Sequence, residues 1–592
     1  MKSLSITLGV ALALSGTAFA ATDKAATPAA APKAPPAWVA ESNQDTQILL
    51  KTFADFAPEG AGQIGVDGLD DQATNLTPDF LDRLNAALDA DVAQFQAMMA
   101  KTTDPHVKQD LQILIDAANN NKRDNQLQAK YLLNFTDVPQ LIFGGVRALV
   151  DPQIPLERQQ KVVKRMEAYA GMLPGRPAIT EQGKALFEAD LKRDPNLLGP
   201  YKAELEQDLQ DQPHYISGLK DLLSQSKVTG WEPAYAKLEA QMNDYIAWEK
   251  SDVMPHVRPQ SHLPEELYAH NLHDLGVDED PRELIKEAEF SFSEIQHQLE
   301  FIAAEVAKEH HYKSSDYRDV IRELKKQQLN PKDILPFYKK RLAAIEDIIR
   351  KQHIVTLPAR SMVIRMGSDA ETAQEPAPHM NSPRLIGNTG EYGEFILPNN
   401  AGQKGGMDDD TFDAAAWTLT SHEGRPGHEL QFASMIENGT SIARGVFAFN
   451  SANVEGWALY SEAEMQPYEP IDGQLIALRD RLLRAARAFL DPMVNLGMIQ
   501  PDDAKAFLER DVVLSPAFAK EEADRFAFRM PGQATSYYYG YHNFMTMRGA
   551  AEVALGPKFD RQKFNDFILS QGLLPPSLMQ KAVDEEFIPS QK

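Results

Sequence analysis

The stretch "PRELIKEAEFSFSEIQHQLEFIAAEVAKEH", residues 281–310, decides the fold class, because its apolar residues recur at spacings of three and four. The pair Asp280 and Pro281 at its start is typical of a helix N-terminus. The same spacing occurs in "FLDRLNAALDADVAQFQAMM" (80–99) and "YKAELEQDLQDQ" (201–212), whereas period-two runs are few. We therefore predict a predominantly α-helical protein with many helices.

The helical spacing is interrupted between Pro358 and Asp408. Two short segments there, "SMVIRM" (361–366) and "GEFILP" (393–398), are the best strand candidates, and a loop rich in Pro, Gly and Asn separates them. We expect a small β hairpin or sheet at this place. An extended peptide could pair with the second strand.

The N-terminus has the pattern of an exported protein. Residues 1–20 resemble a signal peptide, with Lys2 as the charged start, an apolar stretch and a cleavage site at Ala18-Phe19-Ala20. An Ala/Pro linker follows at 21–40. Because it is the only convincing linker, we expect a helical scaffold (41–357) and a site-bearing segment (358–592) to share one core. The periplasm is the expected location, with secretion as the alternative.

Composition limits the partners and the metal ligands. The chain has 592 residues, 43% of them hydrophobic, and no cysteine. Disulfides and a lipid-modified cysteine are therefore excluded, and any metal must use His and carboxylate ligands. After the first 20 residues no stretch is apolar enough for a membrane anchor. The net charge is −25, or −26 without Lys2, which makes nucleic acid and anionic membranes poor partners.

The segment "SHEGRPGHEL", residues 421–430, resembles the zinc motif HExxH but has two additional residues before its second histidine. In a regular helix, residues six apart differ by about 120° around the axis, so His422 and His428 would not share a metal. Pro426 lacks an N–H and must kink or bulge the helix, and Gly427 permits a backbone excursion. The residues alone leave two interpretations open, a bulged zinc motif or two unrelated histidines.

A second segment, "NVEGWALYSEAE" (453–464), supplies carboxylates. Zinc in hydrolases takes three protein ligands, and two His with one Glu is a common set. Glu455 is the candidate third ligand, and Glu462, two turns further along the expected helix, is a candidate partner for a histidine N–H.

A third segment, "PGQATSYYYGYHNFMTMR" (531–548), places Tyr537, Tyr541, Phe544 and Arg548 on one helix face. A tyrosine hydroxyl could support an oxyanion, and Arg548 could hold a substrate carboxylate. Gln533 is a further candidate for substrate binding. Arg479 and Arg484 are alternative carboxylate readers, and an ordinary aromatic core is the alternative for the tyrosines.

Together, "HEGRPGHELQ", "EGWALYSE" and "PGQATSYYYG" with Arg548 resemble the bacterial family called domain of unknown function 885. That family is similar to zinc peptidases whose third ligand is a glutamate on a following helix, such as the neurolysin and carboxypeptidase Taq groups. The resemblance implies a multi-helix zinc-peptidase-like fold and one Zn²⁺ bound by His422, His428 and Glu455. It also implies that Glu423 is the general base and that Tyr537, or Tyr541, supports the oxyanion.

One position departs from that family, which usually has two adjacent histidines after Pro-Gly, whereas here Glu429 takes the second place. If the second residue were the ligand, the protein would be metal-free or would bind metal through Glu429. The retained flanking motifs favour His428.

The expected function is zinc-dependent hydrolysis of peptide bonds in short periplasmic peptides. Zinc would acidify a water molecule, and Glu423 would accept its proton and pass it to the leaving nitrogen. Two alternatives remain: a zinc hydrolase of isopeptide or peptidoglycan stem amides, and a non-catalytic binding protein with a decayed site.

Overall fold

The computed structural model describes residues 35–151, 153–368, 371–372, 377–399 and 407–592. The predicted signal peptide and linker residues 21–34 lie outside this range. The predicted linker is too long at its C-terminal end, because helix α1 begins at Ala37, directly after Pro36, and already buries Val39. Pro36 ends the Ala/Pro composition, and Trp38 and Val39 give the following segment a face that can be buried.

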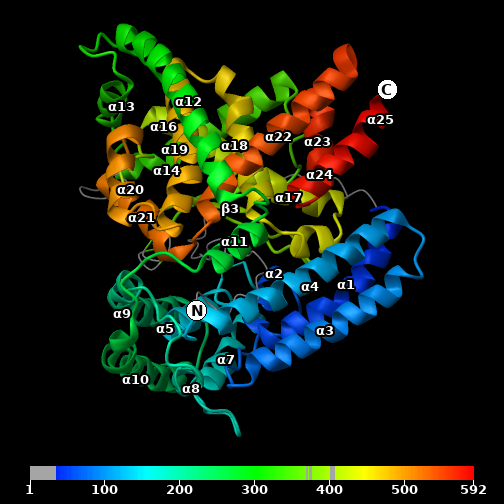
Figure 1. The fold of residues 1–592 in the computed structure, drawn as a ribbon, viewed down its shortest axis with the longest axis vertical. Coiled ribbons are helices and arrows are strands. Elements are labelled where there is room, and N and C mark those ends of the chain that lie inside the picture. The colour runs from blue at the N-terminus through cyan, green and yellow to red at the C-terminus, as the bar shows by residue number, and fades with distance from the viewer. Residues whose placement is uncertain (1–34, 152, 369–370, 373–376, 400–406) are drawn as a thin grey trace.

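The N-terminal part of the molecule, α1 to α10, consists of helices in the described residues (Figure 1). Helices α1, α3 and α4 pack side by side, and α5 packs on α9. The bounds are α1 (Ala37–Phe56), α2 (Pro58–Ile64), α3 (Phe80–Met99), α4 (Pro105–Tyr131), α5 (Val138–Arg147), α6 (Leu156–Gln159), α7 (Val162–Tyr169), α8 (Ile179–Arg193), α9 (Lys202–Gln225) and α10 (Glu232–Trp248).

Helix α11 (Glu265–Asp274) lies between this part and the C-terminal part, α12 to α25 (Figure 1). The long helix predicted at 281–310 is confirmed as α12 (Pro281–Glu309), and the Asp280 side chain caps it by accepting from the Arg282 N–H. The other bounds are α13 (Tyr317–Lys325), α14 (Pro331–Gln352), α16 (Asp413–Leu419), α17 (His428–Asn438), α18 (Ser451–Met465), α19 (Ile471–Asn495), α20 (Pro501–Phe507), α21 (Pro516–Asp524), α22 (Gln533–Leu555), α23 (Arg561–Ser570), α24 (Pro576–Ala582) and α25 (Ile588–Gln591).

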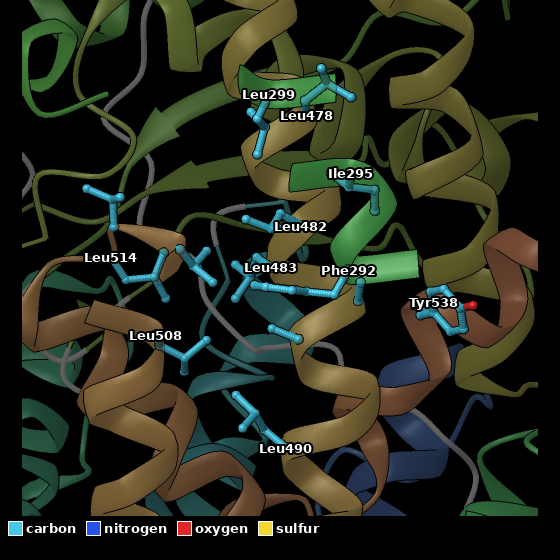
Figure 2. Close-up of a cluster of buried hydrophobic side chains, with 14 of the residues drawn as sticks. Phe292, Ile295, Leu299, Leu478, Leu482, Leu483, Leu490, Leu508, Leu514 and Tyr538 are labelled. Atoms are coloured by element: carbon cyan, nitrogen blue, oxygen red, sulfur yellow. The ribbon is translucent and has the colours of Figure 1, made fainter. Parts of the chain in front are cut away.

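The largest core cluster lies between α12 and α19 and includes residues from both sides of position 358. Figure 2 shows Ile295 and Leu299 of α12 with Leu478 and Leu482 of α19. Each fully buried leucine or isoleucine contributes about 1.5–3 kcal/mol relative to an exposed one. This apolar contact fixes α19 in the C-terminal part, and α19 also contacts α16, α18 and α22.

A three-stranded sheet interrupts the helices. Strands β1 (Val363–Met366) and β3 (Glu394–Leu397) confirm the two predicted strands, but they are parallel neighbours and do not form a hairpin. Strand β2 (His379–Asn381), which pairs antiparallel with β3, was not predicted. The order β1-β3-β2 makes β3 the central strand, so the expected pairing of a peptide with "GEFILP" is wrong: both of its sides are already paired. Strand β2 packs beside residues 420–424.

Among the described residues, no helix has both the length and the apolar character needed to cross a membrane.

Candidate metal centre

The chain presents His422 and His428 from two separate elements. Helix α16 continues into a π-helical turn, η3 (Thr420–Gly424), the backbone is extended at Arg425, and α17 begins at His428. Single π turns in proteins are frequent at functional sites. The two imidazole rings lie 4.7 Å apart and nearly perpendicular. The helix therefore breaks at the Pro-Gly pair, and the break brings the histidines together.

Two contacts hold this break in place. The Pro426 carbonyl accepts hydrogen bonds from Trp457 Nε1 at 3.0 Å and Ser461 Oγ at 3.2 Å. Gly427 is packed so closely on the His422 carbonyl that any Cβ at position 427 would collide with it. The glycine is therefore needed here for close approach.

Helix α18 brings Glu455 to both histidines. Glu455 Oε2 lies 3.4 Å from His422 Nε2 and 3.2 Å from His428 Nε2. This oxygen is buried without a hydrogen-bond partner, whereas Oε1 accepts from Gln533 Nε2 at 3.4 Å. The two imidazoles and the Glu455 carboxylate are thus directed to one point, and His422 and His428 are each 3% exposed.

Two glycines allow α18 and α22 to pack closely enough to form this site. A Cβ at Gly456 would lie 2.5 Å from the Gly540 carbonyl carbon, and a Cβ at Gly540 would collide with the Ala452 carbonyl. Both glycines belong to the motifs around Glu455 and Tyr537. Backbone contact between the helices therefore sets the distance between these two side chains.

Glu462 supports His422 from the side opposite Glu455. Its Oε1 lies 2.6 Å from His422 Nδ1, and its carboxylate also accepts from Thr418 Oγ1 at 2.9 Å and Arg484 at 3.1 Å. Burial opposes protonation of His422, but the nearby carboxylates of Glu455 and Glu462 outweigh burial and raise the pKa of His422 to about 9. The hydrogen bond between His422 Nδ1 and Glu462 orients the imidazole ring so that its Nε2 atom is directed towards Glu455.

The donor set fits zinc. Two ligand atoms about 2.0–2.1 Å from a tetrahedral ion lie about 3.3 Å apart, close to the two Glu455–histidine distances of 3.2 and 3.4 Å. A buried carboxylate oxygen without a donor fits the role of a cation ligand. Within the described part of the chain, the ligand atoms of His422, Glu423 and His428 form the one metal-sized group, within 4.8 Å of one another.

Glu455 is a better third ligand than Glu423. Glu423 Oε1 lies 3.9 Å from His422 Nε2, and this carboxylate is within ion-pair distance of one histidine, whereas Glu455 is within that distance of both. Glu423 is adjacent to the site and 8% exposed. This position leaves it available to act on a water molecule or a substrate.

Glu429 is directed away from the histidines. Its Oε2 accepts from Arg425 Nε at 2.7 Å, and Arg425 also contacts Glu346 at 2.8 Å and donates to the Arg360 carbonyl. Glu429 is fully buried in this arrangement. The residue that replaces the usual second histidine therefore belongs to an ion-pair cluster and makes no contact with Glu455.

Tyr537 is the tyrosine beside the histidines. Its ring is nearly parallel to that of His422, and the two ring centroids are 6.1 Å apart. The guanidinium of Arg487, a residue of α19, lies 4.5 Å from the Tyr537 ring centroid. Burial raises the pKa of Tyr537 to about 12. Tyr541 lies one turn further along α22, under the Arg481 guanidinium.

The expected carboxylate readers are engaged elsewhere. Arg548 pairs with Glu464 and with Glu552, Arg479 pairs with Asp480 at 2.7 Å, and Arg484 binds Glu462. Gln533, expected to bind substrate, donates to Glu455 and to Ser451. The sequence interpretation missed Thr418 as a partner of Glu462, although its position one turn before His422 could have indicated it.

Comparisons with known proteins agree with this fold. The family model described as "Bacterial protein of unknown function (DUF885)" matches residues 58–583, so the chain belongs to that family. A search of curated proteins found no match.

Two solved structures are similar. One is described as a "putative lipoprotein" from Colwellia psychrerythraea, with 17% identity and a TM-score of 0.75 over 93% of this chain and 99% of that chain. The other is described as a "putative lipoprotein of unknown function" from Shewanella oneidensis, with 18% identity and a TM-score of 0.71 over 93% and 100%. At this identity, the likeness shows a shared fold.

Proposed function

We propose that this protein is a zinc-dependent hydrolase that cleaves amide bonds in short peptides in the periplasm. The observation that carries the proposal is the convergence of two imidazole Nε2 atoms on one buried carboxylate oxygen that lacks a donor. Three such ligands are the set that hydrolytic zinc sites use, with a further position left open.

His422, His428 and Glu455 would hold the ion, and Glu462 fixes the orientation of His422. When bound, zinc supplies Lewis-acid chemistry, which polarises a substrate carbonyl and makes a water molecule acidic near neutral pH. Gln533 holds the second oxygen of Glu455 and so keeps Oε2 directed at the histidines.

Glu423 is the general base in this proposal. It follows His422 in the η3 turn, carries no ion pair to a Lys or Arg among the described residues, and borders the same point as the ligands. It would take a proton from the attacking water and deliver it to the leaving nitrogen. Tyr537, stacked beside His422, would donate its O–H to the developing oxyanion.

The burial of the site favours small substrates. His422, Glu423 and His428 are each 8% exposed or less, so a segment of a folded protein would have to unfold to reach them. The sequence resemblance to zinc peptidases supports the same reaction class.

The predicted signal peptide supports export to the periplasm. The two similar structures are each described as a "putative lipoprotein", which is compatible with export.

The test combines metal analysis with turnover. The purified protein should contain one zinc per chain and hydrolyse dipeptides or short peptides. The Glu423→Gln variant should retain zinc, and its rate of hydrolysis should fall about 10²–10⁴-fold. Equal rates in both proteins would refute the mechanism, and absence of zinc after mild purification would indicate a non-catalytic binding protein. Parallel assays of γ- and ε-linked substrates identify an isopeptide or peptidoglycan amidase.

A further inference from the structure

A cavity of about 100 Å³, partly open to solvent, lies between the N-terminal and C-terminal parts of the molecule. Its walls come from the end of α4, the start of α9, α11 and the segment before α22. Figure 1 shows α11 at this junction. Leucines make much of the wall, among them Leu132, Leu198 and Leu267. The space holds several waters or a small organic group, and such junctions are frequent ligand sites.

One wall residue, Arg258, is a buried cation without a counter-ion. It is 8% exposed, and no carboxylate of the described residues lies within ion-pair distance of its guanidinium. One of its nitrogens donates to backbone carbonyls, those of Ser261 at 2.6 Å and His262 at 3.3 Å among them, while Nε is buried without a partner. Burial lowers the pKa of Arg258. The guanidinium also lies over the Tyr201 ring, 5.6 Å from its centroid, and an arginine buried in this way without a carboxylate partner is rare.

Two carboxylates line the same cavity. Asp124, 7% exposed, accepts one side-chain hydrogen bond, from Gln128 at 2.6 Å. Its burial raises the pKa of the Asp124 carboxyl to about 6. Glu204 accepts from the Tyr201 N–H at 3.2 Å. The wall thus presents a cation, two acceptors for an N–H group and an apolar surface.

We propose that this cavity binds the carboxyl-terminal unit of an apolar amino acid. Arg258 would form an ion pair with the carboxylate of the ligand, and the leucines would contact its apolar side chain. Asp124 or Glu204 would accept a hydrogen bond from its N–H group. Two sources offer this chemistry: a free apolar amino acid, or the C-terminal residue of a peptide.

The cavity borders the segment at the start of α22 that contains Gln533, the hydrogen-bond donor to Glu455. Pro531 is part of its wall, and Gln533, two residues later, donates to Glu455. Asn271, also in the wall, donates to the Pro531 carbonyl at 3.4 Å. Binding itself is independent of any hydrolytic activity. The reading of the occupant as a substrate end or a released product rests on the proposed function.

Calorimetric titration of the full chain with L-leucine, the dipeptide Ala-Leu and leucine amide tests the proposal. The Glu423→Gln background prevents turnover and separates binding from catalysis. Leucine or Ala-Leu should bind, and leucine amide, which lacks the carboxylate, should bind roughly ten- to hundredfold more weakly. Tighter binding of leucine identifies the free amino acid as the occupant, and tighter binding of Ala-Leu identifies a peptide end. No binding of either, or equal binding of leucine amide, overturns the proposal.

Variants locate the site. Arg258→Gln should weaken binding roughly ten- to hundredfold. Because Arg258 also holds the 260–262 backbone, Leu198→Trp, which fills the cavity, provides a second variant. Matched controls are Arg176→Gln, whose arginine also donates to backbone carbonyls, and Leu156→Trp, at an exposed leucine. Unchanged affinity in both folded cavity variants overturns the assignment, whatever the zinc content or the rate of hydrolysis.

Discussion

Glu429 Oε2 lies 2.7 Å from Arg425 Nε, and this ion pair turns the residue after His428 away from the metal ligands. His428→Ala should therefore lose the metal, whereas Glu429→Ala should retain it. Glu429→Ala also leaves Arg425 with Glu346 as its remaining carboxylate partner, so it should cost about 3 kcal/mol of stability. Zinc content by mass spectrometry and denaturant unfolding measure the two effects. Metal loss in Glu429→Ala with metal retained in His428→Ala would show that the ligand was assigned to the wrong residue.

Removing the charge of Glu462 should weaken metal binding without removing a ligand. Glu462→Gln loses the carboxylate that orients His422, and partners of this kind are worth about 10–100-fold in metal affinity. Competition with a chelator measures the change. Glu464→Gln, on the same helix but paired with Arg548, is the matched control. Equal zinc affinity in the two variants would contradict the role given to Glu462.

The hydroxyl of Tyr537 should matter for rate more than for binding. Tyr537→Phe keeps the ring beside His422 but removes the O–H donor, so kcat should fall about 10²–10³-fold with little change in KM. Tyr541→Phe should have little effect, because its ring lies one turn away. Steady-state kinetics on one peptide compare the two. A larger loss in Tyr541→Phe would move the oxyanion role to that residue.

The glycine contact between α18 and α22 should be intolerant of a methyl group. Gly540→Ala forces its Cβ against the Ala452 carbonyl and should destabilise the protein by about 1–3 kcal/mol. Gly549→Ala, in the same helix with open space around it, should stabilise by about 0.5–1 kcal/mol. Denaturant midpoints measure both changes. Equal changes in stability in the two variants would mean that the close approach of α18 and α22 does not explain the glycine at position 540.

A buried acid in the N-terminal part should make stability depend on pH. Glu249 is fully buried, one of its oxygens accepts from Gln212 at 3.1 Å, and burial with the nearby Asp137 raises its pKa from 4.5 to about 9. The folded state therefore favours the protonated acid. Its contribution to the unfolding free energy is complete below about pH 4.5 and is lost as the pH rises towards 9.

Glu249→Gln should flatten this decline, because the amide stays neutral at every pH in the range. Denaturant unfolding near pH 5.5 and near pH 8.5 gives the difference, and Glu188→Gln at an exposed glutamate serves as the control. A decline of the same size in Glu249→Gln and wild type would mean that other groups cause it.

Much of the fold could be predicted because helical spacing is a local property. The apolar positions of 281–310 specify α12 without knowledge of any other segment. Strand β2 could not be found in the same way, since His379–Asn381 is three residues long and its pairing with β3 comes from distant parts of the chain. The parallel pairing of β1 with β3 likewise depends on tertiary contacts.

In the site, the residues alone left the pairing of His422 with His428 open, and the family resemblance implied their grouping with Glu455. The structure brings the three side chains together. Their binding of zinc stays a prediction. The partners of Glu429 and Arg548 could not be predicted, because Arg425 lies in the irregular turn after η3 and Glu464 faces α22 only once the helices pack. Long-range ion pairs of this kind leave no spacing in the sequence.

Helix α19 carries leucines that pack on α12 and, between them, Arg484, which holds Glu462 behind His422. The electrostatic environment of the candidate ligands is thus anchored to an apolar contact made by residues far earlier in the chain. Loss of a buried leucine of α12 would therefore weaken the packing that supports α19 and Arg484 without altering any of the three motifs.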